Sequence, residues 1–366
     1  MKIQTTNLKE FKKIFDLTRI AGNAYYEHIY LDFEKEVLTF MNDSAIVRIK
    51  LFIDDKDEKQ ENIFVDGTKF FFLVSTFDYL IIKGKSFYSP QNNKFILQTL
   101  DEELELPEVK EYEWKQVVIN FTEEFNKYLA ISKDYLEITP ETSLFFEKGY
   151  MISLSENRFF QANAKIDPES SFDIPIAVVK IIENLHTKIE DSCILRYRTK
   201  NRGKIYEILY KDLVYNFSSP NATELPFDPF NQDFISSFKH ENFLELDLKS
   251  ILNNVSTLDS YVSDSSSSHC EIKFFEDSLV FYLKNEGEVE YRQPVEFYSD
   301  FEKFREGSFW ISLNRLKIAL SSLNTKRYEK IKIRYNLEED MIYFSSKEET
   351  GDMFIVQTLL EKPNNN

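Results

Sequence analysis

Glycine is scarce in this sequence, with eight glycines among 366 residues. They stand at positions 22, 67, 84, 149, 203, 287, 307 and 351, and the closest two are 17 residues apart. Neither a GxGxxG turn nor a Walker A loop can exist at that spacing, because both motifs need glycines a few residues apart. The chain is therefore not expected to be a nucleotide-driven motor.

Cysteines and long apolar runs are also rare. Cys193 and Cys270 are the only cysteines, so there is no disulfide framework, and this usage fits a reducing compartment. No apolar stretch reaches the roughly 18 residues that indicate a membrane span, and the N-terminus lacks the apolar run of a signal peptide. We therefore expect a cytoplasmic protein without a membrane partner.

Catalytic and metal-binding patterns are missing as well. The four histidines, His28, His186, His240 and His269, form neither an HExxH motif nor a spaced Cys/His cluster. His269 and Cys270 are adjacent, so on a strand they would point to opposite faces. Acidic runs such as 101–103 and 338–340 have the composition of solvated turns. The sequence predicts no metal, no cofactor and no catalytic residue, and an enzyme based on acidic clusters is the least favoured alternative.

Aromatic residues, in contrast, are abundant and make up 15% of the chain, with 34 Phe and 20 Tyr. Such residues suit half-buried strands, so the composition favours sheet. One order of elements then occurs six times, twice in each third of the chain: a strand, a short amphipathic helix and three strands. The helices are expected within 7–20, 67–77, 122–136, 175–188, 247–259 and 313–327. This repetition predicts an α+β fold.

Particular residues mark the helix starts and the domain boundaries. Asn7, Thr122 and Asp247 stand where N-caps are expected, and Pro175 stands where a helix start tolerates a missing N–H. Two stretches that are acidic or contain proline, 104–112 and 221–234, have the composition of linkers. These features predict three domains, at 1–111, 112–234 and 235–366.

Several segments resemble the bacterial-type DNA sliding clamp, the beta subunit of the replicative DNA polymerase. The best local resemblance lies in the last third, at 244–252, 309–320 and 354–360, and the start of the chain, 1–8, also fits. The middle third is the most diverged. As architecture the resemblance covers the whole chain, because the family has three domains of two similar helix-and-strand halves.

The resemblance implies a non-enzymatic processivity factor for DNA replication. Two three-domain chains would form a head-to-tail homodimer, a closed ring of six domains with helices lining the hole and sheets outside. The ring would encircle double-stranded DNA without reading its sequence and would tether the replicative DNA polymerase. A separate clamp loader ATPase would use the nucleotide that this chain is not expected to bind.

The charge distribution agrees with a DNA-facing set of helices. The net charge is −17, but the six helix ranges carry 14 Lys or Arg and 8 Asp or Glu, a net charge of +6, which leaves −23 for the remainder. A sliding protein needs phosphate contacts without base contacts. We therefore expect the following cations to face DNA: Lys9, Lys12, Lys13, Arg19, Lys69, Lys180, Lys249, Arg315, Lys317, Lys326 and Arg327. The alternative is that each is an ordinary solvated surface residue.

The resemblance also implies a hydrophobic pocket for short partner peptides between the second and third domains. The residues that match pocket positions are Leu154, Arg158, Phe159, Pro226, Ile355, Gln357 and Leu359. Gln357 stands where an apolar residue is expected, and Phe159 is bulkier than the usual aliphatic residue. The apolar members could equally be ordinary core residues.

A second function from a different class remains open. The weak basic charge of the middle domain also suits a clamp-like decoy or regulator that binds replication proteins without encircling DNA. A stable ring dimer retained on circular DNA would favour the clamp. Partner binding without retention on DNA would favour the decoy.

Overall fold

A computed structural model describes most of the chain in two compact units. Unit 1 comprises 1–126 and 177–223, and unit 2 comprises 127–176 and 224–366. The described residues are 1–20, 22–55, 60–100, 113–134, 143–155, 158–185, 191–200, 203–219, 244–262, 269–275, 278–283, 289–294, 296–297, 308–323, 330–336, 341–346 and 353–358. Each unit is described by itself.

Unit 1 holds two antiparallel sheets. The five-stranded sheet has the order β5-β1-β7-β8-β9, and the nine-stranded sheet has the order β10-β6-β2-β3-β4-β18-β17-β16-β11. The strands are β1 Lys2–Gln4, β2 His28–Asp32, β3 Val37–Met41, β4 Ala45–Lys50, β5 Phe52–Asp54, β6 Ile63–Asp66, β7 Tyr79–Lys83, β8 Ser86–Tyr88, β9 Lys94–Ile96, β10 Thr99–Leu100, β11 Lys115–Asn120, β16 Ser192–Lys200, β17 Gly203–Tyr210 and β18 Leu213–Ser219.

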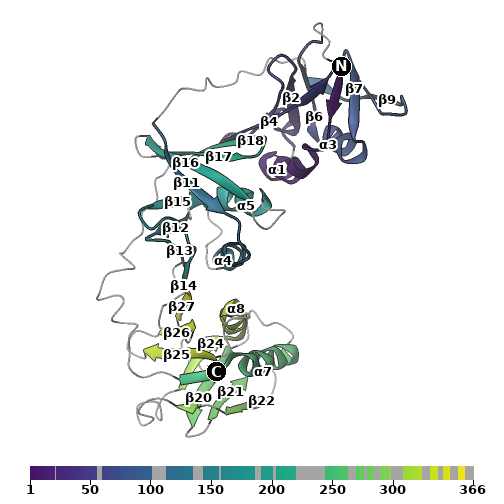
Figure 1. Ribbon diagram of the computed structural model, residues 1–366. Helices are drawn as coiled ribbons and strands as arrows, with labels where there is room; N and C mark the ends of the chain where they lie inside the picture. Colours follow the sequence, from purple (N-terminus) through teal and green to yellow (C-terminus); the bar gives the residue numbers. More distant parts are fainter. Residues whose placement is uncertain are drawn as a thin grey trace. The chain divides into compact units, whose positions relative to one another are not determined.

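The nine-stranded sheet of unit 1 joins strands that lie far apart in the sequence. β4 pairs with β18 in an antiparallel register that sets Ile49 opposite Leu213 and Val47 opposite Tyr215 (Figure 1). Burial alternates along β4, where Ala45, Val47 and Ile49 are buried. This alternation with a period of two is what a sheet with one face on the core requires.

Unit 2 has the same plan with a nine-stranded and a four-stranded antiparallel sheet. Their orders are β15-β12-β13-β14-β27-β26-β25-β19-β23 and β22-β21-β20-β24. The strands are β12 Ser143–Glu147, β13 Tyr150–Ser155, β14 Arg158–Asn163, β15 Phe172–Pro175, β19 Leu244–Asp247, β20 His269–Phe275, β21 Ser278–Leu283, β22 Val289–Pro294, β23 Glu296–Phe297, β24 Ser308–Ser312, β25 Lys330–Asn336, β26 Met341–Ser346 and β27 Met353–Thr358.

All six expected helices occur in the described residues. They are α1 Lys12–Thr18, preceded by the 3-10 turn η1 Lys9–Phe11, then α3 Gly67–Thr76, α4 Glu123–Asp134, α5 Ile176–Leu185, α7 Leu248–Tyr261 and α8 Leu313–Leu323. A further short helix, α2 Ala24–Glu27, was not expected from the pattern. The α+β fold class is confirmed.

The predicted caps are confirmed at two helices and wrong at one. The Thr122 hydroxyl accepts the Phe125 amide at 3.0 Å, and the Asp247 carboxylate accepts the Ser250 amide at 2.6 Å. Asn7 does not cap: its Oδ1 accepts no hydrogen bond from the described residues, its Nδ2 donates to the Lys50 carbonyl at 3.0 Å, and the chain enters α1 through the turn η1 instead. α5 begins directly after Pro175, as predicted.

The core between the helices and strands of unit 1 is aromatic. Phe15 on α1 stacks on Phe71 of α3 with ring centroids 5.1 Å apart and meets Phe40 of β3 edge to face at 5.3 Å. The backbone of Gly67 lies against the same ring, because a Cβ there would be 2.4 Å from Phe15 Cζ. The first residue of α3 must therefore lack a side chain for α1 and α3 to pack at this distance.

The predicted domain boundaries, near 111 and 234, lie outside the described residues. The division into 1–111, 112–234 and 235–366 thus stays a prediction.

Candidate nucleic-acid interface and peptide pocket

The exposed side of α1 carries two of the predicted DNA-facing cations. Lys12 and Lys13 are exposed, whereas Ile14, Phe15 and Thr18 of the same helix are buried. Neither lysine forms an ion pair with any residue that the structure describes. Their ammonium groups are therefore available for phosphate oxygens.

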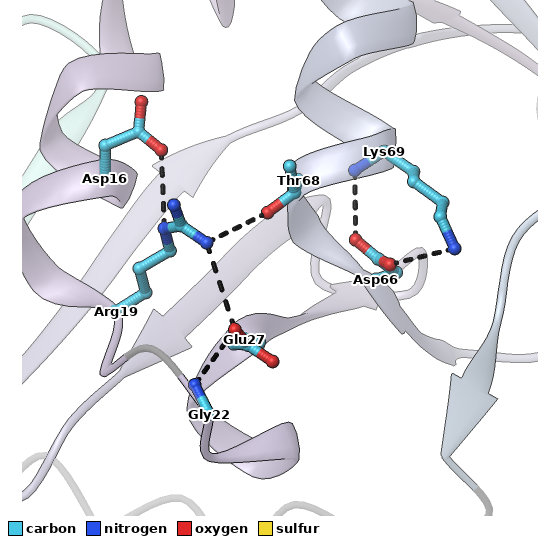
Figure 2. A network of polar contacts seen from close by, with 7 residues as sticks. All are labelled: Asp16, Arg19, Gly22, Glu27, Asp66, Thr68 and Lys69. Atoms are coloured by element: carbon cyan, nitrogen blue, oxygen red, sulfur yellow. Dashed lines mark hydrogen bonds and ion pairs between the residues drawn. The ribbon is translucent and has the colours of Figure 1, made fainter.

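Arg19, at the end of α1, is held by a network of polar contacts (Figure 2). Its Nε lies 3.5 Å from Asp16 Oδ1, and its Nη1 lies 3.9 Å from Glu27 Oε1 and donates to Thr68 Oγ1 at 3.3 Å. Glu27 Oε1 also accepts the Gly22 amide at 3.2 Å. The network joins α1, α2 and the first turn of α3, and its acidic members offset the charge of Arg19.

Two more cations of this unit have acidic partners. Lys9 Nζ lies 3.0 Å from Asp78, and Lys69 Nζ lies 3.3 Å from Asp66. Asp66 is also the N-cap of α3, since it accepts the Lys69 amide at 3.0 Å. Figure 2 shows both contacts of Asp66 beside the Arg19 network.

Four of the six remaining cations lie on α5, α7 and α8. Lys180 and Lys249 are exposed, and no ion pair involves either of them within the described ranges. Lys317 on α8 forms an ion pair with Asp259 on α7, and Arg315 is half-buried on α8. Lys326 and Arg327 lie outside the described residues.

Sequence reasoning missed the acidic partners that come from outside the helices. Glu27 and Asp78 are near Arg19 and Lys9 only because the fold brings α2 and the start of β7 to α1. Asp66 could have been found, because an Asp directly before a helix is a typical N-cap. No group of three or more potential metal ligands occurs in the part of the chain that the structure describes.

The predicted pocket residues are partly brought together in unit 2. β14 pairs with β27, which sets Arg158 opposite Gln357 and Phe160 opposite Ile355. β13 sets Leu154 opposite Phe159. Five of the seven predicted residues thus lie on three adjacent strands. Pro226 and Leu359 are outside the described residues.

The register divides these five residues between two faces of the sheet. Directly opposite residues share a face, and consecutive residues alternate, so the pair Arg158 and Gln357 is on one face and the pair Leu154 and Phe159 is on the other. Phe159 is buried, with 4% of its surface exposed, and Leu154 is half-buried. Ile355 is on the same face as Arg158 and Gln357, because it is two residues from Gln357. Phe159 therefore contributes to the core, and a pocket on one face of the sheet would use either these three residues or Leu154 and Phe159.

The helices offer no membrane-spanning segment. None of those in the described part of the chain combines the length and the apolar character that a membrane crossing needs.

Comparison with known proteins places the fold. No protein-family model and no curated protein matches the sequence. Solved structures do match: a putative DNA polymerase III beta subunit from Eubacterium rectale has 12% identity and a TM-score of 0.75 over 99% of this chain and 100% of that one. The DNA polymerase III subunit beta from Pseudomonas aeruginosa has 12% identity and a TM-score of 0.76 over 99% and 100%. The Helicobacter pylori beta clamp bound to a DNA ligase peptide has 13% identity and a TM-score of 0.71 over 98% and 100%. The chain thus has the sliding-clamp fold along nearly its whole length.

Proposed function

We propose that this chain is a DNA sliding clamp, a non-enzymatic processivity factor that encircles duplex DNA and tethers a replicative DNA polymerase. The observation that carries the proposal is the match to DNA polymerase III beta subunits over 98–99% of the chain, at TM-scores of 0.71 to 0.76. The exposed lysines on its helices support the DNA partner, because sequence-independent binding needs cations that reach phosphates. A separate clamp loader ATPase would place it on DNA.

The sheets of the chain support a head-to-tail homodimer. Each nine-stranded sheet combines five strands from one terminal third of the sequence with four strands from the middle third. The joining strands, β4 with β18 and β14 with β27, are each the last of three consecutive antiparallel strands. One five-stranded and one four-stranded sheet remain, with the edge strands β5 and β9 in the first and β22 and β24 in the second. Of these, β9 and β22 are again each the last of three consecutive antiparallel strands. Pairing β9 of one copy with β22 of another would complete a third nine-stranded sheet.

Exposed apolar side chains occur on β9 and on one helix from each of the two terminal thirds. The three most exposed large apolar side chains among the described residues are Ile96 at 72%, Phe72 at 64% and Tyr261 at 63%. Ile96 is on β9, Phe72 is on α3, which precedes β7, and Tyr261 ends α7, which precedes β20. An unpaired edge strand with an exposed isoleucine favours association with another strand, and large exposed apolar side chains are typical of interfaces. A second copy of the chain would cover them.

Light scattering and variants at these edges test the dimer. The expected mass is close to twice the 43.5 kDa of one chain, and Ile96→Asp or Phe72→Glu is expected to shift it toward one chain. Val118→Asp is the matched control, because Val118 is 50% exposed on β11, the edge of a sheet that is already nine-stranded. A wild-type monomer, or equal loss of mass with Val118→Asp, would refute this interface.

Encirclement is tested without a loader on a linear duplex with biotin at both ends. A ring threads over free ends, and streptavidin added afterwards traps it. The expected result is retention at high salt only when both ends are blocked, because phosphate contacts alone weaken with salt. Equal retention on blocked and open DNA contradicts encirclement. Polymerase binding without any retention would support the decoy instead.

We place the partner-peptide site on β14 and β27, with Arg158, Ile355 and Gln357 on one face of their junction. The support is twofold. The register brings these positions together from the middle and last thirds of the chain, and the Helicobacter pylori beta clamp of the same fold is bound to a DNA ligase peptide.

A further inference from the structure

We infer that acidic side chains hold Arg19, Lys9 and Lys69 in ion pairs within the protein, so that on this pair of helices the contact with DNA falls to Lys12 and Lys13. Asp16 and Glu27 would thereby lower the affinity of the protein for the duplex. The inference rests on the proposed function and names which cations of the lining bind phosphate.

The geometry of Arg19 leaves little of its guanidinium for a phosphate. A bidentate phosphate contact needs two neighbouring N–H groups of the guanidinium. Nε faces Asp16 at 3.5 Å, and Nη1 is shared by Glu27 at 3.9 Å and Thr68 at 3.3 Å. A bidentate phosphate must use Nε or Nη1 together with Nη2, so it would lie beside the Asp16 or Glu27 carboxylate and would compete with Asp16 or with the Thr68 hydroxyl.

The ion pairs also reduce the electrostatic attraction. Glu27, Asp66 and Asp78 lie outside the helix ranges that gave a net charge of +6, and adding their three charges leaves +3. A carboxylate next to a cation repels an approaching phosphate nearly as strongly as the cation attracts it. Exposed ion pairs are individually weak, so DNA can open them, but each opened pair then leaves a carboxylate beside a phosphate.

Lys12 and Lys13 differ from Arg19, Lys9 and Lys69 because no carboxylate within the described residues pairs with their ammonium groups or offsets their charge. They are consecutive, both exposed, and have no ionic partner in the described ranges. Each can therefore contribute a full phosphate contact. A protein that must move along DNA gains from a small number of such contacts, because every additional one slows its movement.

Three variants separate this assignment from direct binding by Arg19. Asp16→Asn with Glu27→Gln removes the acidic partners while Gln keeps an oxygen for the Gly22 amide. Arg19→Gln with Glu27→Gln removes a cation and an anion together and keeps the net charge. Lys12→Gln with Lys13→Gln removes the two exposed lysines. Asp54→Asn is the control, because Asp54 pairs with Lys2 at 3.5 Å across β1 and β5 and forms no ion pair with a predicted DNA-facing cation within the described residues.

Binding to a fluorescein-labelled duplex of mixed sequence is measured by anisotropy at several salt concentrations. Freeing Arg19 adds one phosphate contact, so Asp16→Asn with Glu27→Gln should steepen the salt dependence by about 0.9 in log–log slope and tighten binding about fivefold to tenfold near 0.1 M salt. Arg19→Gln with Glu27→Gln should leave the affinity unchanged. Lys12→Gln with Lys13→Gln should lower the slope by about 1.8, and Asp54→Asn should have no effect.

The outcomes distinguish this inference from the proposed function. If the wild-type chain binds no duplex even at low salt, the proposed function fails. If it binds, but Asp16→Asn with Glu27→Gln matches the control, or Arg19→Gln with Glu27→Gln weakens binding severalfold, the inference is overturned and the proposed function stands. Should the first double variant fail to fold, Asp66→Asn frees Lys69 in the same way and keeps a capping side chain.

Discussion

Replacing Gly67 by alanine tests how α1 and α3, which carry the candidate DNA contacts, are held together. The added Cβ would lie 2.4 and 2.6 Å from two ring atoms of Phe15 and 2.8 Å from Ile29 Cγ2. All three distances are well inside van der Waals contact. Phe15 and Ile29 are both fully buried, and Phe15 packs on Phe40 and Phe71, so the ring has no empty space to move into.

The expected magnitude follows from two opposing effects. Overpacking a filled core costs about 1–3 kcal/mol. Alanine in place of glycine favours a helix by up to about 1 kcal/mol, and less at a first helical position. The net prediction is that Gly67→Ala lowers the free energy of unfolding of unit 1 by about 1–2 kcal/mol, which corresponds to a fall in Tm of about 2–8 °C for a body of this size.

Tryptophan fluorescence can follow unit 1 alone, because the chain has one tryptophan in each unit, Trp114 and Trp310. With Trp310→Phe as the background, urea unfolding monitored at Trp114 reports unit 1. Gly84→Ala is a useful comparison, because Gly84 has a φ of +57° and open space around its Cβ position. Gly84→Ala therefore measures the destabilisation caused by an alanine in a left-handed backbone conformation, without any steric overlap of its Cβ.

A double-mutant cycle with Phe15→Leu provides the decisive result. The shorter leucine removes the ring atoms that the new Cβ would meet. In the Phe15→Leu background, Gly67→Ala should therefore lower the free energy of unfolding by no more than half of what it does in the wild-type background. If Gly67→Ala is neutral or stabilising, or costs the same in both backgrounds, the packing argument at this contact is refuted.

Three further predictions concern DNA, partner proteins and the buried thiols. Reversing the charges of Lys12, Lys13, Arg315 and Lys317 together should weaken retention on DNA and leave far-UV circular dichroism unchanged. Normal retention would show that these four cations do not face DNA. Leu359→Asp should abolish polymerase stimulation while light scattering still gives the wild-type mass, and normal stimulation would move the pocket elsewhere. Burial raises the pKa of the Cys193 and Cys270 thiols from 9.0 to about 12, so iodoacetamide at pH 8 should label them only as their unit unfolds. The same shift predicts constant stability below pH 9.0 and a loss as the pH rises toward 12, because the unfolded chain releases the protons first; rapid labelling of the native protein would contradict both statements.

Local signals in the sequence were enough for the elements and the fold class. The helices of the six repeats were predicted because apolar residues recur with helical spacing and because Thr122 and Asp247 are residues that cap helices. Asn7 shows the limit of this reasoning. Its side-chain nitrogen donates to the Lys50 carbonyl of a distant strand, and its Oδ1 accepts no hydrogen bond from the described residues; no local rule predicts that long-range contact.

The candidate site could be predicted only in part, for a similar reason. The positions of Lys12 and Lys13 on an exposed helix face follow from the helical pattern. The pairing of Lys9 with Asp78 and of Arg19 with Glu27 does not, because these partners lie on other elements. The pocket residues Leu154 and Arg158 were grouped by resemblance, and only the register of β13, β14 and β27 shows that they belong to different faces.

The sequence by itself determined which segments form helices and strands, and that the pattern repeats six times, because both depend on neighbours within a few residues. Only the tertiary structure decided which strands join across more than a hundred residues, as β4 and β18 do. It also decided which cations form ion pairs with acidic residues of the same chain. Both are set by contacts between residues that are distant along the chain. The edges left at β9 and β22 and the exposed lysines of α1 are the parts of the molecule from which its assembly and its hold on DNA are inferred.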